Sequence, residues 1–220
     1  MTQIKFSTER ATFRQFEIDP SHFLWKSSSM TKIQPRALQT RARLLDAAQE
    51  IIAEVGYEGL RTQEVVKRAG VAKGTFFAHF PDKDALMEIL IGAKMDAYLD
   101  RAQGAPTPDS IEALVKLLMP LLNFMRCERY VFDVILRHSG AAAKDNIGPI
   151  ALSFARQDEV FTALLKDAPF RKDISAGLIG EGIQAFAIQA LALDFCTINN
   201  EMPLQERLSI YLNAWLLPAR

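Results

Sequence analysis

One stretch of 22 residues constrains the fold and the function of this chain more than any other part. Residues 62–83 read TQEVVKRAGVAKGTFFAHFPDK, and Ala69-Gly70-Val71 separate two short helical patterns. Glycine stands where the chain must reverse. The second helix is too short, and too polar on one face, to serve the core alone. This pattern predicts a helix-turn-helix, whose second helix enters the major groove of DNA.

The two helices divide their side chains between packing and exposure. The residues expected to hold the helices together are Val65, Val66, Ala69, Val71, Phe76 and Phe80. The residues expected to point outward are Lys67, Arg68, Lys73, Thr75, His79 and Lys83. Residues 30–80 carry eight basic against five acidic side chains, a surplus of three, although the net charge of the chain is zero. A locally basic segment in a neutral protein is typical of phosphate contact at one end.

Composition places the chain among ordinary globular proteins, with 220 residues, 49% hydrophobic and 24% charged. It contains no nucleophile elbow, phosphate loop, metal-spaced His/Cys set or paired carboxylates. We therefore expect no enzyme activity, no metal site and no cofactor. Cys127 and Cys196 lie far apart and are expected to be buried, reduced side chains, with a redox pair as the alternative.

Two sequence features bear on location. The first 29 residues lack the apolar segment of a signal peptide. The run 174–193 is nearly long enough to span a membrane, but Glu181, Gln184 and Gln189 interrupt it, which favours a buried helix. The sequence therefore predicts a cytoplasmic protein.

The residues of the helix-turn-helix also carry a family resemblance. GVAKGTFFAHFPDK at 70–83 resembles the DNA-binding signature of the TetR family of bacterial transcriptional regulators. The resemblance includes LLDAA at 44–48, GYEG at 56–59 and DAL at 84–86. It covers residues 38–98 without gaps. It implies a DNA-binding domain there, with the helix-turn-helix at about 61–80, and a helical ligand-binding and dimerisation domain at 99–220.

The resemblance and the chemistry of the side chains together indicate the residues that contact DNA. Lys73 suits a phosphate or a guanine edge, Thr75 a phosphate or a thymine methyl, and Gln63 an adenine. Gly74 leaves room for the DNA backbone, and Phe77 replaces a tyrosine that is usual in the family, so one hydroxyl contact is missing. The expected set is Arg61, Thr62, Gln63, Ala72, Lys73, Gly74, Thr75, Phe77, His79 and Lys83.

Apolar periodicity predicts an all-α protein of about nine helices, because no alternating β pattern occurs. The first helix is expected from about residue 35 to Val55, with Gly56 ending it. Thr62 and Asp82 are expected to cap the second and fourth helices. Further helices are expected from about Ala72 to His79, from Asp82 to about Arg101, and near 109–125, 127–140, 148–167, 173–198 and 203–217.

The helix expected at 173–198 has two apolar stripes, so we expect both of its sides to be covered. One side would pack within the subunit, and the small-residue side would meet a second copy, as the resemblance implies; a monomer core helix is the alternative. The expected interface residues are Gly182, Ala185, Gln189, Ala192, Leu208, Tyr211, Leu212 and Trp215. The resemblance also implies a cavity for a small-molecule inducer, with Phe124, Phe132, His138, Phe154, Phe161 and Phe186 as candidate lining residues, although each phenylalanine also suits a plain core.

Residues 1–34 fit none of these patterns and are expected to be disordered or an artefact of start assignment, with Met30 as the natural start. The alternative is a genuine basic arm that follows DNA. The function that the sequence predicts is a homodimeric repressor, released from a palindromic DNA operator by a small molecule. The alternative is a ligand- or protein-binding module that acts as an activator or does not bind DNA.

Overall fold

The computed structural model describes residues 35–139, 147–198 and 201–217. Those residues form nine helices and no strand, which confirms the all-α prediction. Residues 1–34, for which the sequence predicts disorder or a wrongly assigned start, lie outside the described residues. The helices are α1 (Pro35–Gly59), α2 (Thr62–Arg68), α3 (Lys73–His79), α4 (Lys83–Gln103), α5 (Ile111–Met125), α6 (Arg129–Ser139), α7 (Pro149–Leu165), α8 (Ala176–Asp194) and α9 (Leu204–Leu216).

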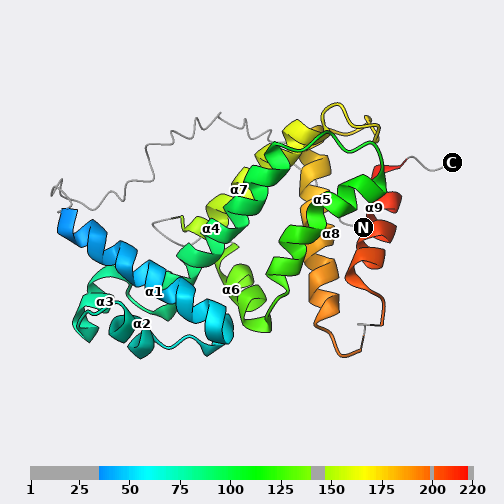
Figure 1. Cartoon of the computed structure of the whole chain (residues 1–220). Helices are drawn as coiled ribbons and strands as arrows, with labels where there is room; N and C mark the ends of the chain where they lie inside the picture. The colour runs from blue at the N-terminus through cyan, green and yellow to red at the C-terminus, as the bar shows by residue number, and fades with distance from the viewer. Residues whose placement is uncertain (1–34, 140–146, 199–200, 218–220) are drawn as a thin grey trace, which may run out of the picture. The chain divides into compact units, whose positions relative to one another are not determined.

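From Gln39 onward the described residues belong to one compact unit. In this unit α1, α2 and α3 lie together, and α4 leads from them to α7 (Figure 1). Because α4 is one continuous helix, it crosses the boundary at 98/99 that the sequence predicts between two domains. That division stays a prediction.

Local signals set most of the helix ends. Gly56 has φ 78° and breaks the helical conformation of α1, as expected for a glycine that follows a helix. Asp82 caps α4, because its side chain accepts a hydrogen bond from the Ala85 N–H at 2.8 Å. The expected cap by Thr62 is wrong: Thr62 is already the first residue of α2, the N-cap is Arg61, and no side chain bonds there.

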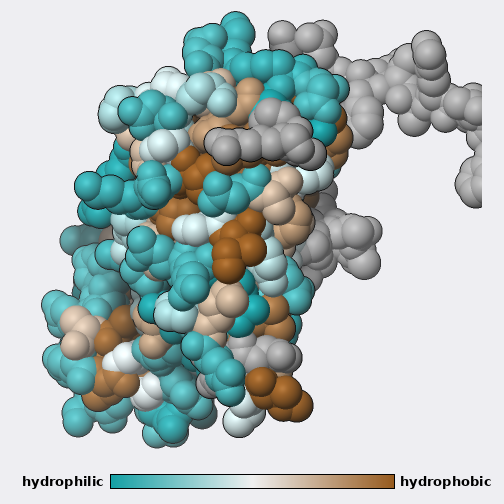
Figure 2. Space-filling view, turned by 90° about the vertical axis from the view of Figure 1, so that its right-hand side faces the viewer, coloured by the Kyte–Doolittle hydropathy of each residue, from teal (hydrophilic) through white to brown (hydrophobic). Residues whose placement is uncertain are grey.

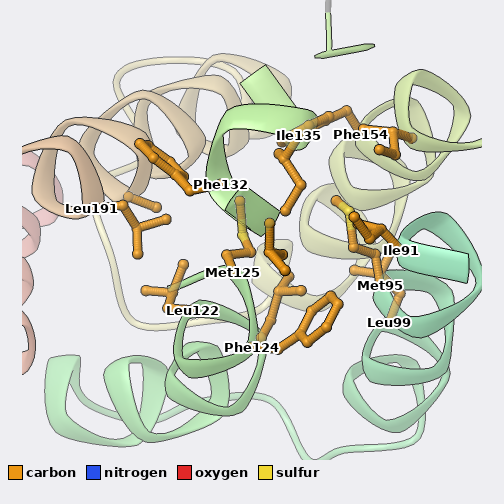
Figure 3. Packing of buried hydrophobic residues seen from close by; sticks show 14 of the residues in the cluster. Ile91, Met95, Leu99, Leu122, Phe124, Met125, Phe132, Ile135, Phe154 and Leu191 are labelled. Atoms are coloured by element: carbon orange, nitrogen blue, oxygen red, sulfur yellow. The ribbon is translucent and has the colours of Figure 1, made fainter. Parts of the chain in front are cut away.

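All nine helices of the described residues contribute buried residues to the core, and Figure 3 shows the part of it that lies between α4, α5, α6, α7 and α8. Met95 and Leu99 of α4 face Phe124 of α5, whereas Phe132 of α6 lies close to Leu191 of α8. All five side chains are buried. This packing fixes α4 between the helix-turn-helix and the remaining helices.

Helix α8 is covered along one face within its own subunit. Ile179, Ile183 and Ala190 are buried there, while Ala185 and Ala192 on the other face are exposed. Among the described residues, α8 is also the one helix long and apolar enough to cross a membrane, with 33% of its most apolar window buried. A single chain therefore covers only one of the two sides of α8 that were expected to be covered, and the other apolar face of α8 is exposed.

The two cysteines also differ from the expectation of burial. Cys127 is exposed, because it lies in the turn that follows α5, and Cys196 is partly buried. Partial desolvation of the thiol, and then the nearby carboxylate of Glu128, raise the pKa of Cys127, so the thiol is protonated at neutral pH.

Candidate nucleic-acid interface

The turn between α2 and α3 has the hydrogen bonds of a Schellman motif. The Gly70 N–H donates to Lys67 O at 3.1 Å, and the Val71 N–H donates to Val66 O at 3.0 Å. Gly70 has φ 62°, a conformation that a side chain disfavours. The glycine therefore ends α2 and directs the chain into α3, as the sequence predicts.

Helix α3 packs on the protein through one side only. Phe76 and Phe80 are almost fully buried, with ring centroids 5.5 Å apart. Val65 and Ala69 of α2 are also buried. These residues confirm the predicted packing of the helix-turn-helix, and they leave the opposite side of α3 without cover from the described residues.

Two arginines of α1 hold the ends of α2 and α3. Arg43 donates to the carbonyl of Ala69 and, at 3.4 Å, to that of Gly70. Arg41 donates to the carbonyl of His79 at 2.8 Å, and its guanidinium lies 4.5 Å from the centroid of the Phe80 ring. Because the last carbonyls of a helix have no partners within the helix, these bonds fix both helix ends on α1.

The open side of α3 carries the residues that the sequence assigns to DNA. Ala72, Lys73 and Gly74 are exposed at its beginning. Phe77 is 47% exposed although its ring contacts Phe76 edge to face. A methyl group added at Gly74 would meet nothing within 4 Å, so its own fold does not require glycine there. A second molecule has room to come close to the backbone at this point.

Thr75 and His79 lie at the border of this open side and are partly buried. Burial, and then the nearby Arg41 guanidinium, lower the pKa of His79. The imidazole is therefore neutral at pH 7, and it is suited to donate a hydrogen bond to a phosphate rather than to neutralise one.

Around α2, the expected contact residues divide into two groups. Gln63 and Arg61 are exposed, and Thr62 is partly covered. Lys83 instead contacts its own chain, because its Nζ donates to Glu58 O at 3.1 Å and lies 4.5 Å from the Tyr130 ring centroid. Burial, and then Arg61, lower the pKa of Lys83. The expectation that Lys83 points outward is therefore wrong.

Arg68 is likewise engaged within the chain. Its guanidinium makes two hydrogen bonds to the Glu54 carboxylate, at 2.5 and 2.8 Å. The pairing joins α2 to α1, so Arg68 positions α2, while the residue is exposed as the sequence predicts. Lys67 is exposed as expected.

A separate cavity of about 540 Å³ lies between the end of α4, the loop that follows it, α5 and α7. Its lining is mostly apolar and includes Leu99, Leu118 and Phe161, together with the cations Arg101 and Lys116. The volume is within the range of about 300–1,000 Å³ that is typical of small-molecule sites.

Of the six candidate lining residues, only Phe161 borders this cavity. Phe124, Phe132 and Phe154 are core residues (Figure 3). Phe124 packs against Tyr57 and Tyr98, and Phe132 stacks on Phe195. His138 pairs with Glu88 at 3.1 Å. Phe186 packs on Tyr211 and Trp215 of α9. Helical periodicity identifies apolar faces, but it does not distinguish the wall of a cavity from a filled core.

Among the expected interface residues, three belong to the subunit's own packing. Leu208 and Leu212 of α9 are fully buried. A Cβ at Gly182 of α8 would lie 2.4 Å from Trp215 Nε1 of the same chain. These corrections leave Ala185, Gln189 and Ala192 exposed, with Tyr211 and Trp215 partly buried. Figure 2 shows that apolar groups interrupt the hydrophilic surface on the side of α8 and α9.

Sequence inspection missed Arg41, Arg43 and Glu128, which act at a distance along the chain. Glu128 contacts residues 70 and 71 positions earlier. Local spacing does not indicate such contacts, because they depend on how α1 and α6 meet.

Comparison with known proteins finds relatives among bacterial transcriptional regulators. A model described as "Bacterial regulatory proteins, tetR family" matches residues 44–90. The Fatty acid metabolism regulator protein of Bacillus subtilis is 34% identical over 159 residues, which cover 70% of this chain and 76% of the relative. The uncharacterized HTH-type transcriptional regulator YvdT of Bacillus subtilis is 31% identical over 100 residues, which cover 46% of this chain and about half, 52%, of YvdT.

Solved structures share the fold at low sequence identity. Thermus thermophilus FadR, a TetR family transcriptional repressor in complex with lauroyl-CoA, superposes with a TM-score of 0.57 at 20% identity, covering 80% of this chain and 92% of that one. Salmonella enterica GusR superposes with a TM-score of 0.54 at 19% identity, covering 84% and 98%.

Proposed function

The chain belongs to the TetR family of DNA-binding transcriptional regulators, and on that premise we propose that it is a homodimeric repressor released from a palindromic operator by a small molecule. Since its relatives are transcriptional regulators, it is a regulator and not an enzyme. We place its action in the cytoplasm, where the DNA is. The observation that carries the proposal is the exposed side of α3, which bears Lys73 and Phe77 opposite a buried anchor.

The geometry of α3 supports insertion into the major groove. Phe76 and Phe80 hold one side of α3 on the protein, and Arg41 fixes its last turn, so the helix is presented rigidly. Lys73 at its start offers a flexible cation, and Gly74 allows close approach of the DNA backbone. Ala72, Thr75, Phe77 and His79 complete the contact surface, with Arg61, Thr62 and Gln63 beside it.

Replacing Lys73 with alanine tests the DNA contact. We expect Lys73→Ala to weaken binding to the DNA upstream of the protein's own gene about tenfold, because one cation–phosphate or cation–base contact is lost. The slope of log K against log salt should decrease by about 1, since one fewer counterion is released. Fluorescence anisotropy at several salt concentrations measures both quantities.

Lys166→Ala is the matched control, because it removes the same exposed charge at the end of α7. It should change neither affinity nor salt slope by a comparable amount. Equal effects of the two variants would contradict a direct contact of Lys73 with DNA.

We propose a second copy of the chain as the cover of the open face of α8. Ala185 and Ala192 are exposed on α8, Ile210 of α9 is 49% exposed, and Leu217, which directly follows α9, is 42% exposed. Small residues allow two helices to approach closely, and apolar exposure of this kind marks interaction surfaces. A dimer would present two α3 helices to half-sites about 34–36 Å apart.

For the small molecule, we propose a ligand with a long acyl chain in the cavity beside α4. Two facts support this choice: one relative is named a fatty acid metabolism regulator, and the FadR structure contains lauroyl-CoA. The mostly apolar lining suits a hydrocarbon chain, and Arg101 and Lys116 suit an anionic head group. Because the cavity borders α4, a ligand there can change the position of the helix that leads to the DNA-reading part.

Lauroyl-CoA is the probe for this ligand class. We expect micromolar lauroyl-CoA to release the protein from DNA, and coenzyme A without the acyl chain to leave the complex intact, because the apolar cavity favours the chain. Lys116→Ala should raise the lauroyl-CoA concentration needed for release without changing DNA affinity in its absence. A complex that resists lauroyl-CoA would contradict the proposed ligand class, while leaving the DNA-binding proposal standing.

A further inference from the structure

A five-residue segment, Arg126–Tyr130, joins α5 to α6 and contacts two distant parts of the fold in turn. Arg126 and Arg129 contact the end of α8. Glu128 contacts the end of α1, and Tyr130 contacts the start of α4. Figure 1 shows this loop beside the end of α1. We name residues 126–130 the connecting segment.

On the side of the DNA-reading helices, Glu128 makes the decisive contact. Its two carboxylate oxygens accept hydrogen bonds from the backbone N–H groups of Tyr57 and Glu58, both at 2.8 Å. A Cβ at Gly56 would lie 2.6 Å from Glu128 Oε1, so the carboxylate approaches a site where glycine is needed for space as well as for its φ of 78°. Charged hydrogen bonds of this kind are among the stronger ones in proteins.

The backbone of Glu128 also begins α6. Its carbonyl accepts hydrogen bonds from the N–H groups of Val131 and Phe132, at 3.1 and 3.3 Å. One residue therefore starts α6 and holds the last turn of α1. Any rotation of the first turn of α6 moves the acceptor of Tyr57 and Glu58.

Lys83 and Tyr130 make further contacts between the end of α1, the start of α4 and the connecting segment. Lys83 donates to the carbonyl of Glu58 and lies over the Tyr130 ring, and the Tyr130 hydroxyl donates to Asp84 at 3.1 Å. The last turn of α1 is thus held at two N–H groups by the connecting segment and at the Glu58 carbonyl by the start of α4.

On the other side, the connecting segment is attached to the end of α8. Arg126 pairs with Asp194 at 3.0 Å, and the Arg129 guanidinium lies 5.4 Å from the Phe195 ring centroid. Helix α8 carries the open face to which the proposed function assigns a second copy. The same five residues therefore contact the last turn of α1 and the start of α4, which flank the helix-turn-helix, and also the helix of the proposed dimer interface.

We propose that Glu128 is a positioning residue for DNA binding, and that the connecting segment transmits the position of α8 and α6 to α1–α3. This inference rests on the proposed function, because it assumes a dimer that binds DNA. In such a dimer, the connecting segment sets the orientation of α3 in one subunit relative to α3 of the partner subunit. Glu128 itself makes no contact with DNA in this proposal. It acts by holding the last turn of α1 at Tyr57 and Glu58.

The sign of the effect on DNA affinity tests the inference. Removing a carboxylate from a DNA-binding protein raises its affinity if charge alone acts, because repulsion of the phosphates decreases. We expect the opposite for Glu128→Ala, a loss of about tenfold with an unchanged salt slope, since positioning is lost and no phosphate contact is. Glu128→Gln, which keeps one acceptor oxygen, should have a smaller loss.

Glu112→Ala is the matched control. Glu112 is an exposed glutamate in the first turn of α5, and it makes no hydrogen bond or ion pair with the described residues. It should leave the affinity unchanged or raise it slightly. The inference is overturned if Glu128→Ala binds DNA as tightly as Glu112→Ala does.

Amide hydrogen exchange on the full chain separates this inference from the proposed function. In Glu128→Ala, the amides of Tyr57 and Glu58 should exchange on the order of tenfold faster, because their acceptor is gone. Arg126→Ala should also accelerate them, although Arg126 does not contact them, since it releases the connecting segment from Asp194.

Unchanged exchange at Tyr57 and Glu58 in Glu128→Ala would refute the role of Glu128, and unchanged exchange in Arg126→Ala would refute the connection to α8. A wild-type protein that binds no DNA would refute the proposed function instead, and the exchange rates would still decide whether the contacts connect the two parts.

Discussion

Phe76→Ala should lower the free energy of unfolding by about 3–5 kcal/mol, the usual cost of removing a fully buried aromatic ring. Phe76 is 0% exposed and packs between Phe77 and Phe80, with ring centroids 5.4 and 5.5 Å away. Helix α3 has only seven residues, too few to be stable without such packing. Loss of the ring should therefore detach α3 from the protein and abolish DNA binding. Urea denaturation at fixed protein concentration measures the change.

The adjacent residue provides the control. Phe77→Ala removes the same ring from a position that is 47% exposed, so we expect a loss of stability of about 1 kcal/mol or less. This variant should still weaken DNA binding, because Phe77 lies on the proposed contact surface. Equal destabilisation by the two substitutions would show that α3 does not present one buried and one open side.

Ala185→Arg should convert the proposed dimer into a monomer. Ala185 is exposed on the open face of α8, where a long charged side chain would hold two helices apart and remain buried without a partner. Each monomer would then bind one half-site, and operator affinity should decrease on the order of a hundredfold, because the second half-site is no longer bound within the same complex. Analytical ultracentrifugation and anisotropy measure the two effects.

Ala155→Arg makes the same substitution at an exposed alanine of α7. It should leave both the molecular mass and the operator affinity near those of the wild type. A wild-type protein that is monomeric at micromolar concentration would contradict the dimer directly. A dimeric Ala185→Arg variant would place the interface on another face.

The fate of Lys83 illustrates how far residue type predicts a role. A lysine in the first turn of α4 suits an anion. In the structure, however, its ammonium group donates to Glu58 O and lies over the Tyr130 ring. Leu208 and Leu212 make the same point for the α8–α9 face, where apolar periodicity indicates a contact but not whether the contact lies within one chain or between two.

The sequence by itself determined what depends on neighbours within a few residues. The all-α class, the turn at Gly70, the break in α1 at Gly56, the cap at Asp82 and the buried pair Phe76 and Phe80 all follow from helical spacing, positive φ and local hydrogen bonds. Only the tertiary structure decided which polar groups meet across the fold. Arg41 at the end of α3 and Glu128 at the end of α1 act over separations of 38 and 70 to 71 residues, and their partners are backbone groups, which every residue carries and no sequence pattern distinguishes.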